Sequence, residues 1–220
     1  VVFAAVGFET TAPATAAAVL KAQEAQLSNF TVLCSHKRIV PAMLGLLNAG
    51  RVRLHGFLCP GHVSVIIGCQ AYRPVVQQHR MPCVVAGFEA VQMAEALAAL
   101  AEQVAEQRAD LENDYPQVVK PEGNPVALKM LDQVFEPKQV CWRGLGEIAD
   151  SGLVLRAAYR QFEASQRFAL SMHADDEPEG CLCGQVICGT ATPSECDLFG
   201  TVCTPLNPLG PFMVSSEGTC

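Results

Sequence analysis

The sequence predicts an α/β protein with Rossmann-like layers around a mainly parallel sheet, followed by a small loop-rich segment at the C-terminal end. Through the first half of the chain, short apolar runs alternate with amphipathic, Ala-rich stretches, as in strands joined by crossover helices. In the stretch 181–220, six of the 11 cysteines lie among glycines and prolines, where no helix or strand of ordinary length fits.

The first part of the chain is expected to hold four strands and three helices. Its first six residues are all apolar, as in a strand that is buried on both faces. The second helix has Pro41 in its first turn and Gly50 directly behind it. The third repeats Ala and Leu on one face and Glu and Gln on the other. In order, we predict strand 1–6, helix 14–26, strand 31–34, helix 41–49, strands 54–58 and 82–86, and helix 90–108.

A polar stretch over 110–117 marks a predicted boundary. Beyond it we expect a second mixed unit, with a helix over 124–135 that Asn124 can cap and an extended segment over 152–159. The only tryptophan, Trp142, stands beside Arg143 and two glycines, and this group is interpreted as a turn. An acidic run over 173–180 indicates a linker. The predicted regions are an α/β domain over 1–115, a second mixed α/β segment over 116–172, and a cysteine-rich segment over 173–220.

The composition is that of a globular protein, with 50% hydrophobic and 17% charged residues. The formal net charge is -7, and without basic runs this argues against non-specific binding to nucleic acid. No apolar stretch approaches the length of a membrane span, so we expect no membrane partner.

The cysteine content is high for a cytosolic protein but below that of a disulfide-scaffolded secreted domain. We therefore expect a reducing cytoplasm. The five cysteines outside the C-terminal segment stand in apolar surroundings and are predicted to be small buried side chains: Cys34, Cys59, Cys69, Cys83 and Cys141.

Three loops follow predicted strands, at the edge of the sheet where ligands bind in open α/β folds. Glu9, in the Gly-Phe-Glu-Thr-Thr sequence over 7–11, suits a metal or a polar partner; the alternative is a solvated residue beside a helix cap. His62, within 59–64, can carry a proton or serve only as a structural hydrogen-bonding group. The stretch 87–89 repeats Gly-Phe-Glu. Glu9 and His62 are therefore candidate catalytic residues on loops expected to share one crevice.

Four cysteines of the C-terminal segment have the spacing C-x14-C-x6-C-x16-C, and they are Cys181, Cys196, Cys203 and Cys220. Four thiolates can hold a [4Fe–4S] cluster or a tetrahedral zinc ion. Structural zinc sites use paired C-x2–4-C hairpins, whereas single cysteines on separate loops favour a cluster. Cys183 and Cys188 remain as additional thiols, either redox participants or simply buried.

Taken in order, these motifs resemble those of the HypD family of hydrogenase maturation proteins. The resemblance covers nearly the whole chain and is densest in the C-terminal segment. It rests on residues 7–11, 56–57, 60–64, 68, 119–124, 142–144, 151–153, 181–184, 196–200, 203–205 and 213–218.

The resemblance implies a factor that helps to assemble the Fe(CN)2CO group of [NiFe]-hydrogenases, as an iron scaffold and electron-transfer protein more than a turnover enzyme. It implies a HypC-like small chaperone and a HypE-like cyanide donor as partners. It also implies a [4Fe–4S] cluster on Cys181, Cys196, Cys203 and Cys220, with Cys183 beside it as a candidate redox residue. The Fe(CN)2CO iron would be carried by the full-length protein.

Two features depart from the family pattern. Relatives have an N-terminal region whose Cys-Gly and Pro-Gly-Cys-Pro-x-Cys motifs hold the iron being modified, so we expect a fragment without this second iron site. In addition, the family's Gly-Pro-Cys-Met reads Gly210-Pro211-Phe212-Met213 here. If the replaced cysteine pairs with Cys183 in relatives, that thiol relay is broken here unless Cys188 substitutes.

Two other functions stay open at this point. A thiol–disulfide oxidoreductase that carries a cluster would use Cys183 and Cys188. A zinc-stabilised interaction module would use the same four thiols as the cluster.

Overall fold

The structure is a computed structural model that describes residues 1–50, 52–170, 178–214 and 218–220. The strands are β1 (Val2–Gly7), β2 (Thr31–His36), β3 (Phe57–Pro60), β4 (Cys83–Ala86), β5 (Leu111–Asn113), β6 (Phe135–Trp142) and β7 (Gly146–Leu155). The α-helices are α1 (Ala12–Glu24), α2 (Ile39–Asn48), α3 (Gly61–Ile67), α4 (Arg73–His79), α5 (Ala90–Ala105), α6 (Pro125–Val134), α7 (Ala164–Arg167) and α8 (Cys183–Ile187). Short 3-10 helices are η1 (Cys69–Tyr72), η2 (Ala157–Phe162) and η3 (Pro193–Glu195).

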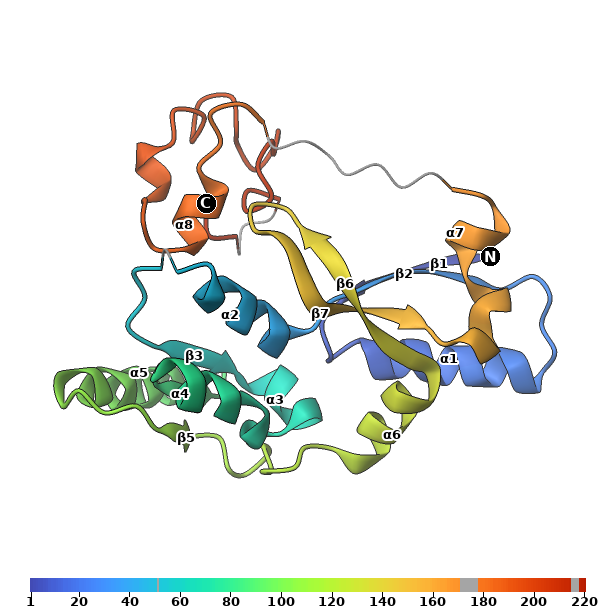
Figure 1. The fold of residues 1–220 in the computed structure, drawn as a ribbon, viewed down its shortest axis with the longest axis horizontal. Coiled ribbons are helices and arrows are strands. Elements are labelled where there is room, and N and C mark those ends of the chain that lie inside the picture. Colours follow the sequence, from blue (N-terminus) through green and yellow to red (C-terminus); the bar gives the residue numbers. More distant parts are fainter. Residues whose placement is uncertain (51, 171–177, 215–217) are drawn as a thin grey trace.

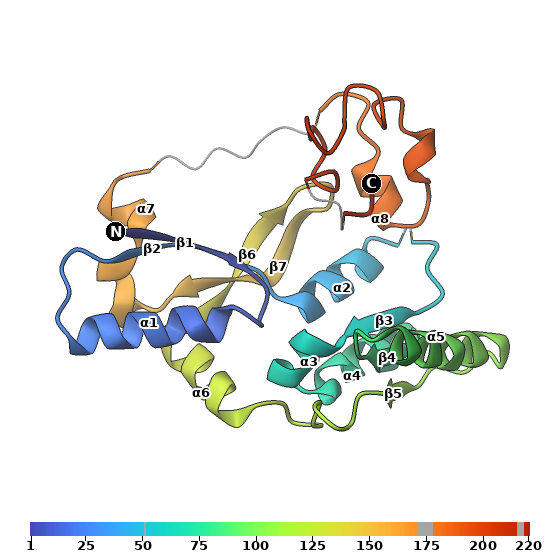
Figure 2. The same cartoon turned by 180° about the vertical axis from the view of Figure 1, so that it is seen from behind.

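The described residues form α/β layers, as the alternating pattern predicts. One parallel sheet pairs β1 with β2, and another has the order β3-β4-β5, also parallel. Strands β6 and β7 form an antiparallel hairpin that reaches from the first sheet to the C-terminal segment (Figure 1). The reverse view shows α1 and α6 on the same side of the first sheet (Figure 2).

Two larger apolar cores hold these layers together. In the first, Val19 and Val32 pack with Val134, Phe135 and Phe162, so segments distant in sequence close around the first sheet. The second is built by residues between 39 and 119, around β3, β4 and the α2–α4 region. The chain therefore leaves the first layer after β2 and returns to it with α6 and the hairpin.

Several predicted elements are confirmed with small shifts of their ends. Helices α1, α2, α5 and α6 and strands β1, β2 and β4 all occur, and the Asn124 side chain caps α6 by accepting from the N–H groups of Val126 and Ala127. Strand β3 begins at Phe57, three residues later than predicted. The extended segment ends at Leu155, and η2 follows it. Residues 173–177 of the predicted linker lie outside the described residues.

The hairpin and the helices α3 and α4 were not predicted. Each of these helices has seven residues, too few to show a hydrophobic period, and α4 follows α3 with only η1 between them. The burial pattern of β6 is interrupted by the exposed residues Pro137 and Lys138. His62 consequently lies in the first turn of α3 and not in a loop.

Two burial predictions were wrong. The first strand is exposed except at Ala5, because β1 has a neighbouring strand on one side only in the described structure. Among the scattered cysteines, Cys59, Cys69 and Cys83 are buried as expected, whereas Cys34 is half-buried and Cys141 is exposed on the hairpin.

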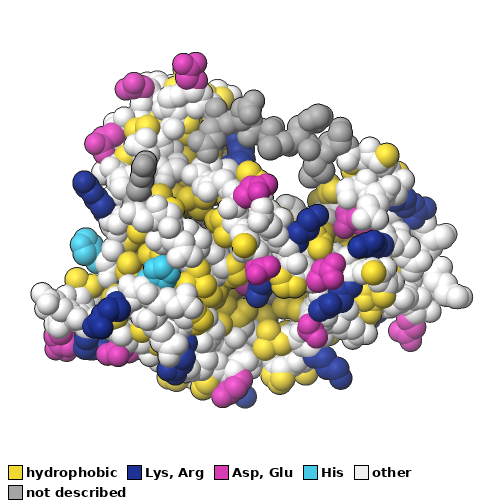
Figure 3. All heavy atoms as spheres, viewed as in Figure 1, with side chains coloured by type: hydrophobic (Ala, Val, Ile, Leu, Met, Phe, Trp, Pro, Cys, Tyr) yellow, Lys and Arg dark blue, Asp and Glu magenta, His cyan; other side chains and the backbone are white. Residues whose placement is uncertain are grey.

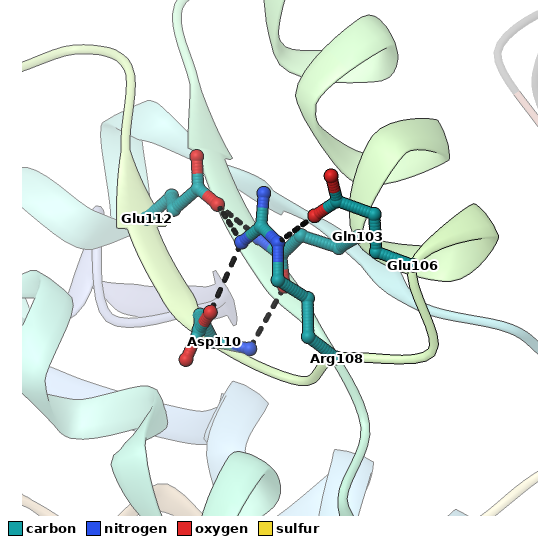
Figure 4. Close-up of polar contacts among 5 residues, drawn as sticks. All are labelled: Gln103, Glu106, Arg108, Asp110 and Glu112. Atoms are coloured by element: carbon teal, nitrogen blue, oxygen red, sulfur yellow. Dashed lines mark hydrogen bonds and ion pairs between the residues drawn. The ribbon is translucent and has the colours of Figure 1, made fainter.

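A polar network fixes the end of α5 to β5 (Figure 4). The buried Gln103 amide donates to Glu112 Oε1 at 2.7 Å and accepts from the Asp110 N–H at 2.8 Å. The Arg108 guanidinium contacts the carboxylates of Glu106, Asp110 and Glu112. These contacts hold the turn between the helix and the strand, and they involve none of the candidate site residues.

Surface charges of both signs are interspersed, and apolar side chains gather near the middle of one face (Figure 3). A groove of about 660 Å³ lies between α2 and the hairpin, with Leu44, Gly45 and Ile148 among its lining residues. Among the described helices, none combines the length and apolar character that crossing a bilayer requires.

Candidate metal centre

Three thiols of the C-terminal segment gather around Gly210. A Cβ atom at Gly210 would lie 2.7 Å from Cys183 Sγ and 2.9 Å from Cys181 Sγ. The N–H groups of Leu209 and Gly210 point at Cys203 Sγ, at 3.4 and 3.5 Å. Only glycine fits between these sulfurs, and the two N–H groups are donors of the kind that stabilise a ligating thiolate.

Cys196 and Cys220 complete the group. The Cys196 thiol lies 3.7 Å from the Gly180 carbonyl oxygen, next to Cys181. The Cys220 N–H donates to the Phe212 carbonyl at 3.4 Å, which brings the end of the chain back beside Cys183. The four predicted ligands and Cys183 therefore come together from four separate turns.

Burial and mutual repulsion raise the pKa of three of the thiols in this group. Burial raises the pKa of Cys181, Cys183 and Cys220 above the ordinary value, and the charges of neighbouring thiols raise it further. The Phe212 backbone opposes this effect at Cys183 by lowering its pKa. Thiols that resist ionisation together are stabilised as thiolates when a cation shares their charge.

The hairpin tip positions this group on the rest of the protein. Gly144 and Gly184 touch through their backbones, because a Cβ at Gly184 would lie only 2.4 Å from the Gly144 oxygen. Arg143 donates to the Leu209 carbonyl at 3.2 Å, directly before the Gly210 turn. The sequence Trp142–Gly144, interpreted above as a simple turn, is therefore the support of the cysteine segment.

The same hairpin joins the cysteine segment to the first strand-end loop. Trp142 lies against Phe8 with 6.1 Å between the ring centroids, and its indole N–H donates to the buried Ser151 hydroxyl at 2.8 Å. Lys37 Nζ lies 5.4 Å from the Trp142 ring. No pattern in the sequence relates Phe8 to Trp142, so only the fold reveals this connection.

Cys188 has different surroundings. Burial alone raises its pKa, with no contribution from another thiol. Its carbonyl accepts from the Arg53 N–H at 2.8 Å, which ties the end of α8 to the segment before β3. The backbone of Cys188 thus links the base of the segment to the rest of the protein.

The donor set consists of thiols, which can hold either a [4Fe–4S] cluster or a zinc ion. Among the described side chains, no three His, Cys, Asp or Glu residues converge as ligands of one metal ion. A tetrahedral zinc site needs four sulfurs about 2.3 Å from one atom. In a [4Fe–4S] cluster each cysteine binds a different iron, so its four thiols need not converge on one point.

Glu9 is buried at the start of α2 and not in solvent. It is 5% exposed, and both its carboxylate oxygens accept from the Ile39 N–H, at 3.1 and 3.3 Å. It also lines a cavity of about 200 Å³ with Arg38 and Phe135. Burial raises its pKa, while the backbone N–H groups of Glu9 and Ile39 and the charge of Arg38 oppose the increase.

The Glu9→Gln variant should be more stable than the unmodified protein, and the difference in the free energy of unfolding should grow as the pH rises. Because the folded chain keeps this proton above pH 4.5 and the unfolded chain loses it there, stability falls as the pH rises from 4.5 through the folded pKa. A glutamine oxygen still accepts from Ile39 but carries no charge. Thermal unfolding between about pH 4 and 8 measures the difference, at about 1.4 kcal/mol per pKa unit. The exposed Glu24→Gln serves as control, and equal pH profiles for all three proteins would contradict the expectation.

His62 is exposed and stacks on Phe88, with 4.0 Å between the ring centroids. The start of α3 and the loop after β4 are therefore adjacent, whereas the Glu9 loop follows β1 in the other sheet. Among the contacts of the described residues, none joins His62 to Glu9 or to Cys183. The catalytic assignment of these three residues remains a prediction.

The fold and the site define a thiol-rich α/β protein whose C-terminal segment packs on the tip of the β6–β7 hairpin. The HypD family model, described as the hydrogenase formation hypA family, matches residues 1–220. The chain belongs to the HypD family.

Relatives are similar along the entire chain. A hydrogenase expression/formation protein HupD of Azotobacter chroococcum is 44% identical over 226 residues, covering 100% of this chain and 60% of the relative. The hydrogenase maturation factor HypD2 of Bradyrhizobium diazoefficiens is 44% identical over 228 residues, with the same coverage. The maturation factor HypD of Rhodobacter capsulatus is 43% identical over 225 residues. The chain spans about 60% of the length of these relatives.

Proposed function

We propose that this chain is part of a hydrogenase maturation factor whose C-terminal segment binds a [4Fe–4S] cluster. The observation that carries the proposal is the gathering of Cys181, Cys183 and Cys203 around Gly210, in a chain that matches the HypD family over its full length. Cys196 and Cys220 lie in the same group.

The residues of the chain have defined parts in this proposal. Cys181, Cys196, Cys203 and Cys220 hold the cluster, and the N–H groups of the Gly210 turn stabilise the Cys203 thiolate. When bound, the cluster can accept and donate single electrons. Cys183, which is 5% exposed and lies within this group, is the additional thiol that can exchange a proton beside it.

The chain acts in this proposal as a scaffold and electron-transfer protein in the assembly of the Fe(CN)2CO group. The iron that receives cyanide and carbon monoxide is the cargo. A HypC-like chaperone and a HypE-like cyanide donor are the partners, and the cytoplasm is the compartment. The names of the relatives, which refer to hydrogenase expression, formation and maturation, support the general role.

Complementation tests this proposal. The part of the Azotobacter chroococcum relative that has no counterpart here is joined to the chain, and the fused protein is produced in cells that lack their own HypD. We expect hydrogenase activity to return, and to be lost with Cys196→Ser. A fused protein that is folded and abundant but leaves the cells without hydrogenase activity would refute the proposed role.

The structure gives less support to a thiol–disulfide oxidoreductase that uses Cys183 with Cys188. Cys183 is influenced by Cys181 and Cys220, whereas no other thiol contributes to the pKa of Cys188. Thiol titration before and after reduction distinguishes the oxidoreductase from the maturation factor. Only the oxidoreductase requires a reducible disulfide.

A further inference from the structure

Strand β1 carries an apolar sequence on an exposed edge. Val2, Phe3 and Val6 are 50%, 45% and 68% exposed, and only Ala5 is buried. In parallel sheets, strands with continuous apolar runs are covered on both faces and paired on both edges. The sequence of β1 is thus that of an interior strand, while its position in the described structure is that of an outer one.

Most backbone groups on one edge of β1 have no hydrogen-bond partner among the described residues. The carbonyls of Val1 and Gly7 accept from the N–H groups of Thr31 and Lys37 on the β2 side, both at 2.9 Å. Because peptide groups alternate along a strand, those of Val2, Ala4 and Val6 point to the opposite edge. Within the described part of the chain, only the Val6 carbonyl has a partner on that edge, the Thr11 hydroxyl at 3.2 Å.

An open edge of this kind is unfavourable in a finished protein. A flat apolar edge strand is a template for pairing with other chains, and proteins protect such edges with charges, proline or a bulge. Residues Val1–Val6 contain none of these devices.

We infer that the free edge of β1 is the docking site for a further parallel β-strand, provided by the polypeptide that corresponds to the unmatched part of the relatives. The chain aligns over its whole length but over only 60% of each relative, so about two fifths of the relative has no counterpart here. That length is sufficient for a further strand and for apolar residues that would pack on the exposed side chains of Val2 and Val6. This inference involves no cysteine and stands apart from the proposed cluster.

Hydrogen exchange of the β1 amides tests the inference. The 220-residue chain is compared with the fused protein that carries the unmatched part of the Azotobacter chroococcum relative in its natural order. We expect the amides of Val2, Ala4 and Val6 to exchange more slowly in the fused protein than in the 220-residue chain, by at least about tenfold. Equal exchange rates overturn the inference, whether the added part stays unfolded or packs elsewhere.

A pair of lysine variants gives an independent readout. Val6→Lys should lower the Tm of the fused protein and leave that of the 220-residue chain nearly unchanged, because Val6 is exposed only in the latter. Leu206, which is 99% exposed in the C-terminal segment, provides the control Leu206→Lys, expected to change neither protein. Protection of β1 in the chain alone that rises with concentration would assign the edge to a second copy and overturn the inference.

Discussion

Replacing Cys203 by serine is expected to remove nearly all iron and sulfide from protein prepared without oxygen. The unmodified chain should hold about four irons and four sulfides. Cys203 is 6% exposed and receives two backbone N–H groups, so a serine oxygen there meets a site shaped for a larger, softer thiolate. Metal analysis, acid-labile sulfide and the visible absorption of the cluster measure the loss.

Cys188→Ser is the matched control for this experiment. It makes the same chemical change within the same short segment, but at a thiol that no other thiol influences. We expect it to keep its iron and sulfide. If the unmodified protein instead holds about one zinc and no sulfide, the cluster is excluded and the segment is a zinc-stabilised unit.

The clustering of cysteines among glycines and prolines predicted that thiols of this segment would lie close together, as Cys181, Cys183 and Cys203 do around Gly210, whereas the assignment of four of them as cluster ligands remains a prediction. It did not predict the surroundings of Cys188, since the Arg53 contact at that residue comes from the segment between α2 and β3. Nor did it predict the support of the Gly210 turn by Arg143, which is 66 residues distant along the chain. Long-range contacts of single side chains leave no periodic signal in a sequence.

The strands of the first half were predictable from short apolar runs, and the longer helices from amphipathic, Ala-rich stretches between turn residues. Glu9 illustrates where this reasoning fails. A carboxylate after a strand was compatible with a metal, a polar partner or solvent, whereas the structure buries it on the N–H of Ile39. Glu9 is buried because α2 begins beside the loop after β1. This placement depends on tertiary packing and leaves no local pattern in the sequence.

Gly68→Ala is expected to destabilise the fold by about 3 kcal/mol. Gly68 ends α3 with a φ of 81° and a ψ of 152°, a backbone region essentially restricted to glycine, where alanine costs on the order of 1–3 kcal/mol. A Cβ there would also lie 2.2 Å from the Pro121 carbonyl oxygen, and such overpacking costs a further 1–3 kcal/mol, roughly. The neighbouring backbone cannot move freely, because Gln70 donates its N–H to Pro121 and Asn124 donates its N–H to Ile66.

The Gly146→Ala variant separates the cost of the backbone conformation from the cost of overpacking. Gly146 has a similar φ of +77°, but a Cβ there would meet no described atom within 4 Å. It should therefore show only the conformational cost, so that Tm falls by about 3 °C, against about 8 °C for Gly68→Ala. Thermal unfolding of the two variants measures both costs. An equal decrease in Tm for both variants would contradict this expectation. It would mean that the 120–124 turn moves away from residue 68 at little cost, and that the close backbone approach does not fix the start of α6.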